Sequence, residues 1–222
     1  MIAAAGFGSR MLPASKATPK ELLTVVDRPV IQYIVEEALD ADIEHVVFVL
    51  SRGKEAAEAY FDHNRELESD IEASGKTQLL NEVLKPILNQ GRASFIRQGK
   101  ASGIGHAIWC ARDIVANRPF ADLLPDVICA EKPSATRALI DVYEENSGCA
   151  IAVNAVSDDD LHKYGVISLG SGPRIGTAVS VGALVERPPR GQAPTNLAIT
   201  GRFVLTPDIF GHLEKAKRGA GD

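Results

Sequence analysis

The sequence predicts an α/β fold, an open sheet covered by helices, from three observations. Short apolar segments typical of buried strands alternate with segments whose apolar residues recur at helical spacing. Residues 46–50 contain no polar residue, which is typical of a parallel strand buried on both faces. Turns rich in glycine and proline separate the segments. This order of strand, helix and strand favours right-handed crossovers between neighbouring strands.

In the first half of the chain, each expected strand is followed by an expected helix. Residues 1–5 are a short apolar strand, and residues 29–42 are a helix with Ile31, Ile34 and Val35 on one face. The other elements of this half are a strand at 46–50, helices at 54–61 and 65–84, a strand at 93–97, a helix at 104–115 and a strand at 121–126.

The second half is richer in strands. Four strand-like segments are joined by turns that contain glycine and proline, so we expect them to extend the same sheet. These segments are residues 149–156, 164–169, 178–186 and 198–205. The chain shows neither repeats nor a low-complexity linker, and this favours one domain over two.

The composition excludes several classes of protein. A chain of 222 residues with 45% hydrophobic and 24% charged residues fits one globular domain. A net charge of -5 gives no overall positive field, so we expect no nucleic-acid partner. No segment has the roughly 18 apolar residues of a membrane helix, and no signal peptide precedes the first strand, so we expect a cytoplasmic protein away from membranes. Three widely spaced cysteines predict reduced thiols and no zinc site.

The segment AAAGFGSRMLPASKATPKEL, residues 3–22, predicts a phosphate-binding loop. Its glycines follow a strand and let backbone N–H groups approach anionic oxygens. Arg10, Lys16 and Lys20 lie on a loop stiffened by prolines and match the charge of a triphosphate, although a solvated basic loop is the alternative. A dinucleotide fingerprint would need a third glycine where Met11 stands, and the Gly-Lys-Ser/Thr of a P-loop is absent.

The same segment resembles the signature of the sugar-1-phosphate nucleotidylyltransferases, roughly G-x-G-[ST]-R-x-x-P-x-[ST]-K-x-x-P-K. The resemblance is strongest to the members that use UTP and glucose 1-phosphate, and it continues in order through RQGKASGIGHAIWCARDIV, FADLLPDV, HKYGVI, VERPP and APTNLAITGRFVL. It implies a Rossmann-like open mixed sheet of the nucleotide-diphospho-sugar transferase type. One nucleotidyltransferase domain, 1–222, would contain a nucleotide-binding half, 1–130, and a sugar-binding half, 131–222, without the C-terminal segment usual in the family.

The resemblance also implies which residues hold the nucleotide. Arg10 would grip the triphosphate and the departing pyrophosphate, and Lys20 would neutralise the α-phosphate under attack, so these two are the expected catalytic residues. Gln98 would read uracil, since its amide offers a donor and an acceptor to the base edge. The expected nucleotide-binding residues are therefore Ala4, Ala5, Gly6, Gly8, Glu21 (near the ribose), Gln98 and Gly103, with His106 as a further candidate beside them.

A metal ligand and a sugar-phosphate site complete what the resemblance implies. Asp126 ends the strand at 121–126, at the sheet edge where ligands of α/β proteins bind, so it is the expected Mg²⁺ ligand; a turn aspartate is the alternative. Glu186 would bind sugar hydroxyls, Arg187 the sugar phosphate, and Gly165 would offer a backbone N–H. The family usually has lysine where Arg187 stands.

The implied reaction needs no protein nucleophile. Glucose 1-phosphate would attack the α-phosphorus of UTP in line, giving UDP-glucose and pyrophosphate, while Mg²⁺, Arg10 and Lys20 spread the developing charge. Two alternatives stay open: a relative that uses dTTP or another sugar phosphate, and a non-catalytic sensor of nucleotide sugars. The family also implies a homo-oligomer.

Overall fold

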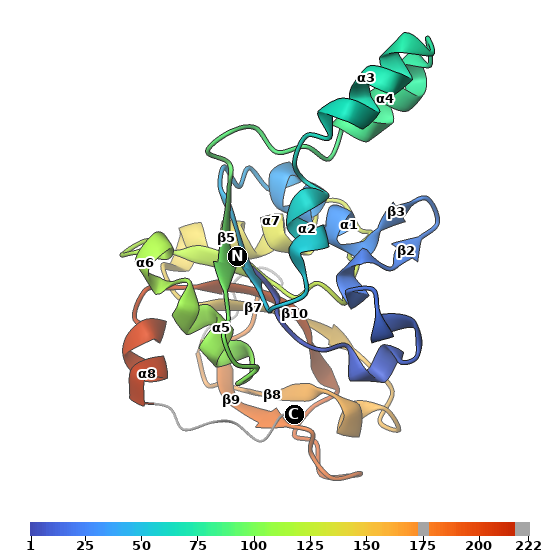
Figure 1. Ribbon diagram of the computed structural model, residues 1–222. Coiled ribbons are helices and arrows are strands. Elements are labelled where there is room, and N and C mark those ends of the chain that lie inside the picture. The colour runs from blue at the N-terminus through green and yellow to red at the C-terminus, as the bar shows by residue number, and fades with distance from the viewer. Residues whose placement is uncertain (173–177, 216–222) are drawn as a thin grey trace.

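The computed structural model describes residues 1–172 and 178–215, and in these ranges eight strands form one mixed sheet (Figure 1). Their order across the sheet is β5-β4-β1-β6-β10-β8-β9, and β7 pairs with β10. The strands are β1 (Ile2–Ala4), β4 (Val46–Leu50), β5 (Ala93–Arg97), β6 (Phe120–Leu123), β7 (Ala150–Ala155), β8 (Gly165–Leu169), β9 (Val181–Glu186) and β10 (Leu197–Leu205). The expected open mixed sheet is therefore confirmed.

The first half of the chain forms the parallel part of the sheet. β1 lies between β4 and β6 and is parallel to both, with Ala4 opposite Leu50 and Ile2 opposite Leu123. β10 then pairs antiparallel with β6 and joins the strands of the second half to this sheet. The carboxyl ends of β1, β4 and β6 consequently meet at one edge, which is where the loops after these strands converge.

Helices cover both faces of the sheet. On one face, α1 and α7 pack on the larger core, and on the other face α5, α6 and α8 pack on a smaller one. A short hairpin of β2 (Thr24–Val25) and β3 (Arg28–Pro29) precedes α1. The helices are α1 (Val30–Asp40), α2 (Glu55–Ala59), α3 (Arg65–Ala73), α4 (Thr77–Leu84), α5 (Ile104–Cys110), α6 (Arg112–Val115), α7 (Ala135–Asn146) and α8 (Ile209–Lys215).

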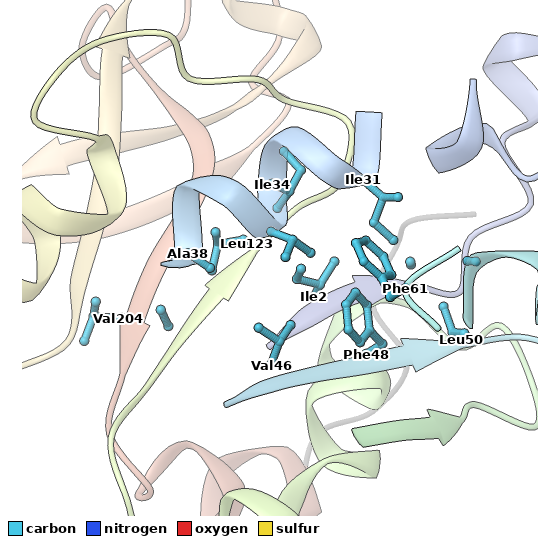
Figure 2. Packing of buried hydrophobic residues seen from close by; sticks show 14 of the residues in the cluster. Ile2, Ile31, Ile34, Ala38, Val46, Phe48, Leu50, Phe61, Leu123 and Val204 are labelled. Carbon is cyan, nitrogen blue, oxygen red and sulfur yellow. The ribbon is translucent and has the colours of Figure 1, made fainter. Parts of the chain in front are cut away.

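The larger core fixes the central strands beneath α1. Figure 2 shows Ile31 and Ile34 of α1 pointing toward Ile2 and Phe48 on the strands. The ring of Phe48 stacks on that of Phe95 with 4.9 Å between centroids. Ile2, Ile31, Ile34 and Phe48 are fully buried, so the strand that leads into the glycine loop is held firmly.

Besides the short hairpin of β2 and β3, which was not expected, four elements differ from the expectation. The helix expected at 65–84 is two helices, because the chain turns at Gly75, where φ is +68°, and the pair projects from the body (Figure 1). The helix expected at 104–115 is interrupted at Ala111. The strand expected at 121–126 ends at Leu123, because Pro125 has no N–H for the sheet ladder. The fourth, α7, was not expected; Ser134 caps it by accepting from the N–H of Arg137.

None of the helices in the described ranges combines the length and apolarity needed to cross a membrane.

Candidate active site

The loop after β1 folds back on the turn that carries Lys20. It contains three short 3₁₀ turns, Ser9–Met11, Ala14–Lys16 and Lys20–Leu22. Gly8 has a φ of +68°, and a Cβ there would lie 3.0 Å from Cβ of Lys20. The hydroxyl of Ser15 donates to the carbonyl of Gly8 over 2.7 Å. Glycine is therefore needed at position 8 for both backbone conformation and space.

Lys20 and Asp126 form an ion pair at the sheet edge. Nζ of Lys20 lies 2.9 Å from Oδ2 of Asp126, which follows β6. Burial opposes ionisation of Asp126, but Lys20, with a smaller contribution from Arg10, outweighs it and holds the pKa of Asp126 below its ordinary value. The structure thus brings together two residues for which the family resemblance implies separate roles, a catalytic cation and a metal ligand.

Arg202 holds the backbone on both sides of Asp126. Its guanidinium donates to the carbonyls of Leu124 over 3.1 Å and Val127 over 2.6 Å. Arg202 is fully buried and pairs with the carboxylate of Glu37 in α1 over 2.8 Å. We did not single out Arg202 from the sequence, although a charged residue within an apolar strand is a signal that could have found it.

Lys54 holds the glycine loop itself. Its Nζ donates to the carbonyl oxygens of Ala4 over 2.5 Å and Gly6 over 2.7 Å, and to Oε1 of Glu21 over 2.7 Å. Burial lowers the pKa of Lys54, while the contact with Glu21 acts in the opposite direction. The carboxylate of Glu21 is buried in this pair, and its expected contact with a ribose stays a prediction. Lys54 was also missed in the sequence.

Gln98, Gly103 and His106 form one cluster beyond β5. The amide of Gln98 donates to the carbonyl of Gly103 over 3.1 Å, and its Nε2 lies 2.9 Å from Nδ1 of His106. The backbone N–H of Gln98 donates to the carbonyl of Leu50. Gln98 is 4% exposed, so its side chain is held in a defined orientation. The grouping of Gln98 with Gly103 matches the sequence prediction, whereas uracil reading stays a prediction.

The residues expected to bind the sugar phosphate lie together, with Gly165 on β8, Glu186 at the end of β9 and Arg187 directly after it. Gly165 pairs with Glu186 across these strands, and a Cβ on Gly165 would lie 3.1 Å from Oε2 of Glu186. The backbone N–H of Arg187 donates to the carbonyl of Tyr164, and Arg187 has a φ of +45°. The side chains of Glu186 and Arg187 are more than half exposed, so both are accessible to a ligand.

Asp126 has the chemistry of a Mg²⁺ ligand. Mg²⁺ is commonly held by one or two carboxylates, with phosphate oxygens and waters completing its shell. Asp126 supplies one ionised, partly exposed carboxylate at the sheet edge. Among residues 1–172 and 178–215 no cluster of three or more potential metal-ligating side chains occurs.

A cavity of about 430 Å³ lies at the opposite edge of the sheet. Met1, His45 and Phe120, at or just before the amino ends of β1, β4 and β6, are among the residues that line it. None of the expected site residues lines this cavity. The candidate site is therefore the carboxyl edge, where the loops carrying the expected residues converge.

Comparison with known proteins gives consistent matches along the whole chain. The model of the nucleotidyl transferase family matches residues 1–221. A UTP–glucose-1-phosphate uridylyltransferase of Bacillus subtilis is 46% identical over 221 residues, which are 100% of this chain and 75% of that protein.

Solved structures agree with this result. A UTP-bound UGPase from Acinetobacter baumannii superposes with a TM-score of 0.90 and 38% identity over 98% of this chain and 77% of that one. A UDP-glucose pyrophosphorylase complexed with UDP-glucose gives a TM-score of 0.84 and 34% identity over 98% of this chain and 79% of that one.

Proposed function

The chain belongs to the nucleotidyl transferase family, and we propose that it transfers the uridylyl group of UTP to glucose 1-phosphate. The names of its relatives support the two substrates, since proteins that the chain matches along its length are UTP–glucose-1-phosphate uridylyltransferases. The structural observation that carries the proposal is the contact between Lys20 and Asp126, 2.9 Å apart. This contact places a cation that can bind phosphate and a carboxylate that can bind a metal at the same edge of the sheet.

The reaction follows from the charges of its reactants. A phosphate oxygen of glucose 1-phosphate, already ionised at neutral pH, attacks the α-phosphorus of UTP. A new P–O bond forms, the bond between the α-phosphorus and the bridging oxygen breaks, and pyrophosphate leaves with the electron pair. The two anions repel each other, so the work of the protein is to align them and to neutralise charge.

We assign to Lys20 and Arg10 the role of neutralising the negative charge of the phosphates of UTP. Arg10 is exposed on the loop after β1, where its guanidinium can bind the β- and γ-phosphates, while Lys20 binds the α-phosphate. In the structure, Asp126 pairs with Lys20 and neutralises it. Lys20 would exchange this partner for the α-phosphate as UTP binds, and Asp126 would then be free to hold a metal.

We propose Asp126 as the residue that holds Mg²⁺. When bound, the metal would neutralise phosphate oxygens of UTP and of the leaving pyrophosphate. Because the pKa of Asp126 is lowered, its carboxyl is ionised throughout the neutral range, as a metal ligand must be.

The remaining contacts divide between the two halves of the chain, 1–130 for the nucleotide and 131–222 for the sugar. Glu186 accepts from sugar hydroxyls, Arg187 binds the sugar phosphate and the N–H of Gly165 adds a donor. The nucleotide lies against Ala4, Ala5, Gly6, Gly8, Gln98 and Gly103, while the buried Glu21 acts through its pair with Lys54. A homo-oligomer stays a prediction from the family resemblance.

The test is pyrophosphate release from UTP and glucose 1-phosphate with Mg²⁺. We expect UDP-glucose as the product, no turnover in excess chelator, and a large loss of kcat in Asp126→Asn, which keeps the shape and loses the charge. Replacing UTP by dTTP should lower kcat/KM. Full turnover in chelator, or a wild-type rate for Asp126→Asn at limiting Mg²⁺, would reject the metal assignment, and faster turnover of dTTP would reject the nucleotide assignment.

A further inference from the structure

Lys54 is a buried lysine to which the proposed reaction gives no role, yet its ammonium is surrounded by groups of the candidate site. Its partners are the carbonyls of Ala4 and Gly6 and the carboxylate of Glu21, all within 2.7 Å at their nearest oxygen. The side chain of Lys54 is 8% exposed and that of Glu21 is 0% exposed. Because a buried charge is stable only when it is paired and hydrogen-bonded, these acceptors account for Lys54 in the interior.

The two carbonyl contacts set the direction of two N–H groups. In a trans peptide unit, the C=O of one residue and the N–H of the next point in opposite directions. The carbonyls of Ala4 and Gly6 face Lys54, so the N–H groups of Ala5 and Phe7 are turned away from it. In the described part of the chain no backbone carbonyl accepts from the N–H of Phe7. Outward N–H groups in a glycine-rich turn are the donors that bind phosphate oxygens.

Through its ion pair with Glu21, Lys54 also fixes the position of the turn that carries Lys20. Glu21 directly follows Lys20 in the 3₁₀ turn Lys20–Leu22, and Lys54 itself stands just before α2. One ammonium therefore ties the loop after β1, the turn that carries Lys20 and the start of α2 to a single point. A shift of Lys54 would move the donors of the loop and the ammonium of Lys20 together.

We propose that Lys54 is a positioning residue for nucleotidyl transfer. It fixes the N–H groups of Ala5 and Phe7 and the ammonium of Lys20 with respect to the triphosphate of UTP, and it acts only through them. The inference rests on the proposed function, because that function makes the triphosphate the ligand of this loop.

The test uses the full chain with Lys54→Met combined with Glu21→Gln, so that neither partner is left as an unpaired buried charge. The matched control is Lys76→Met, which removes an exposed lysine beside α4. We expect kcat/KM for UTP to fall by about 100-fold relative to the control, because small displacements of positioning groups cost this much. The KM for glucose 1-phosphate should stay within about twofold, since the hydrogen bonds of Lys54 in the described part of the chain all lie in the nucleotide half.

A purely structural role gives a different pattern. It lowers the unfolding temperature and reduces the activity toward both substrates in proportion to the unfolded fraction. That pattern, or a folded double variant whose kcat/KM for UTP lies within about twofold of Lys76→Met, would overturn the proposal.

Lys54→Arg covers the case in which the double variant does not fold. It keeps the charge pair with Glu21, but the planar guanidinium cannot bind the two carbonyls and the carboxylate in the same geometry. We expect a folded protein with about a tenfold loss of kcat/KM for UTP alone. Full activity in this variant would also overturn the proposal.

Calorimetric titration with UTP separates this inference from the proposed function. If the wild type binds UTP and releases no pyrophosphate, the proposed function fails, and Lys54 is still tested by UTP affinity. Weaker UTP binding by the double variant than by Lys76→Met supports the positioning role, and equal affinities refute it.

Discussion

Asp122 is a buried carboxylic acid whose replacement should stabilise the protein in a pH-dependent way. It lies in β6, the strand that leads to Asp126, and it is fully buried. Within the described residues neither of its carboxylate oxygens has a hydrogen-bond partner. Burial raises the pKa of Asp122 from 3.8 to about 6, against the opposing charges of the Met1 amine and Arg202. Ionised Asp122 therefore destabilises the folded state.

The size of this effect follows from the pKa. A group whose pKa is higher in the folded state loses its proton more easily in the unfolded chain, so the folded state becomes less stable as pH rises through this window. A difference of about two pH units, at about 1.4 kcal/mol each, costs about 3 kcal/mol above the folded pKa. At about pH 4.5 the same relation gives a cost of about 1 kcal/mol.

Asp122→Asn keeps the shape of the side chain and cannot ionise. Its stability relative to the wild type should rise by about 2 kcal/mol between about pH 4.5 and about pH 8, measured by urea unfolding at both values. The Met1 amine, whose pKa burial lowers to about 6, titrates in the opposite sense, so each comparison is made between variant and wild type at one pH. Asp70→Asn, on the exposed surface of α3, is the control.

An equal difference at the two pH values would refute this account of Asp122. That result would mean that the carboxylate is solvated or paired when ionised, in contradiction to its burial and its missing partners.

Three further predictions concern activity, each measured by initial rates. Lys20→Ala should lower kcat by about 100- to 1000-fold, and much more than UTP affinity, as for other preorganised charge stabilisers; a change confined to KM would make Lys20 a uniform binding residue. Gly8→Ala should lower kcat, because its Cβ would lie 3.0 Å from Cβ of Lys20 in a left-handed conformation; an unchanged kcat would show that the loop yields without moving Lys20. Arg187→Ala should raise the KM for glucose 1-phosphate far more than that for UTP, while Arg187→Lys keeps most activity; loss of UTP binding alone would move Arg187 to the nucleotide side.

The sequence predicted the buried strands better than the helices. β4 and β5 have the expected bounds because each is a short segment of apolar or β-forming residues between clear turns. In α7, charged and polar residues interrupt the apolar pattern, and the helix becomes recognisable only when Leu139 is seen packed on the core. The hairpin of α3 and α4 depends on one glycine turn, which helical spacing alone does not locate.

The sequence named candidate members of the site but not the contacts between them. The family resemblance named Lys20 and Asp126 separately, but 106 residues separate them, and only the adjacency of β1 and β6 brings them together. The sequence pattern does not indicate that Lys54 and Arg202 are buried, because charged residues are mostly at the surface. Their partners, Glu21 and Glu37, are 33 and 165 residues away, a distance that no local pattern spans.

The two buried cations hold the backbone of two loops at the candidate site. Lys54 holds carbonyls of the loop after β1, and Arg202 holds the carbonyls that flank Asp126 after β6. Replacing a buried ion pair by apolar residues is often neutral for stability, so stability alone gives no reason to keep either pair. The orientation of the backbone gives a reason to keep them, because each cation donates hydrogen bonds that fix the direction of carbonyl groups. The partly exposed pair of Lys20 and Asp126 then joins two segments that are already fixed, so in the proposed reaction UTP would replace this one contact and leave the loops around it in place.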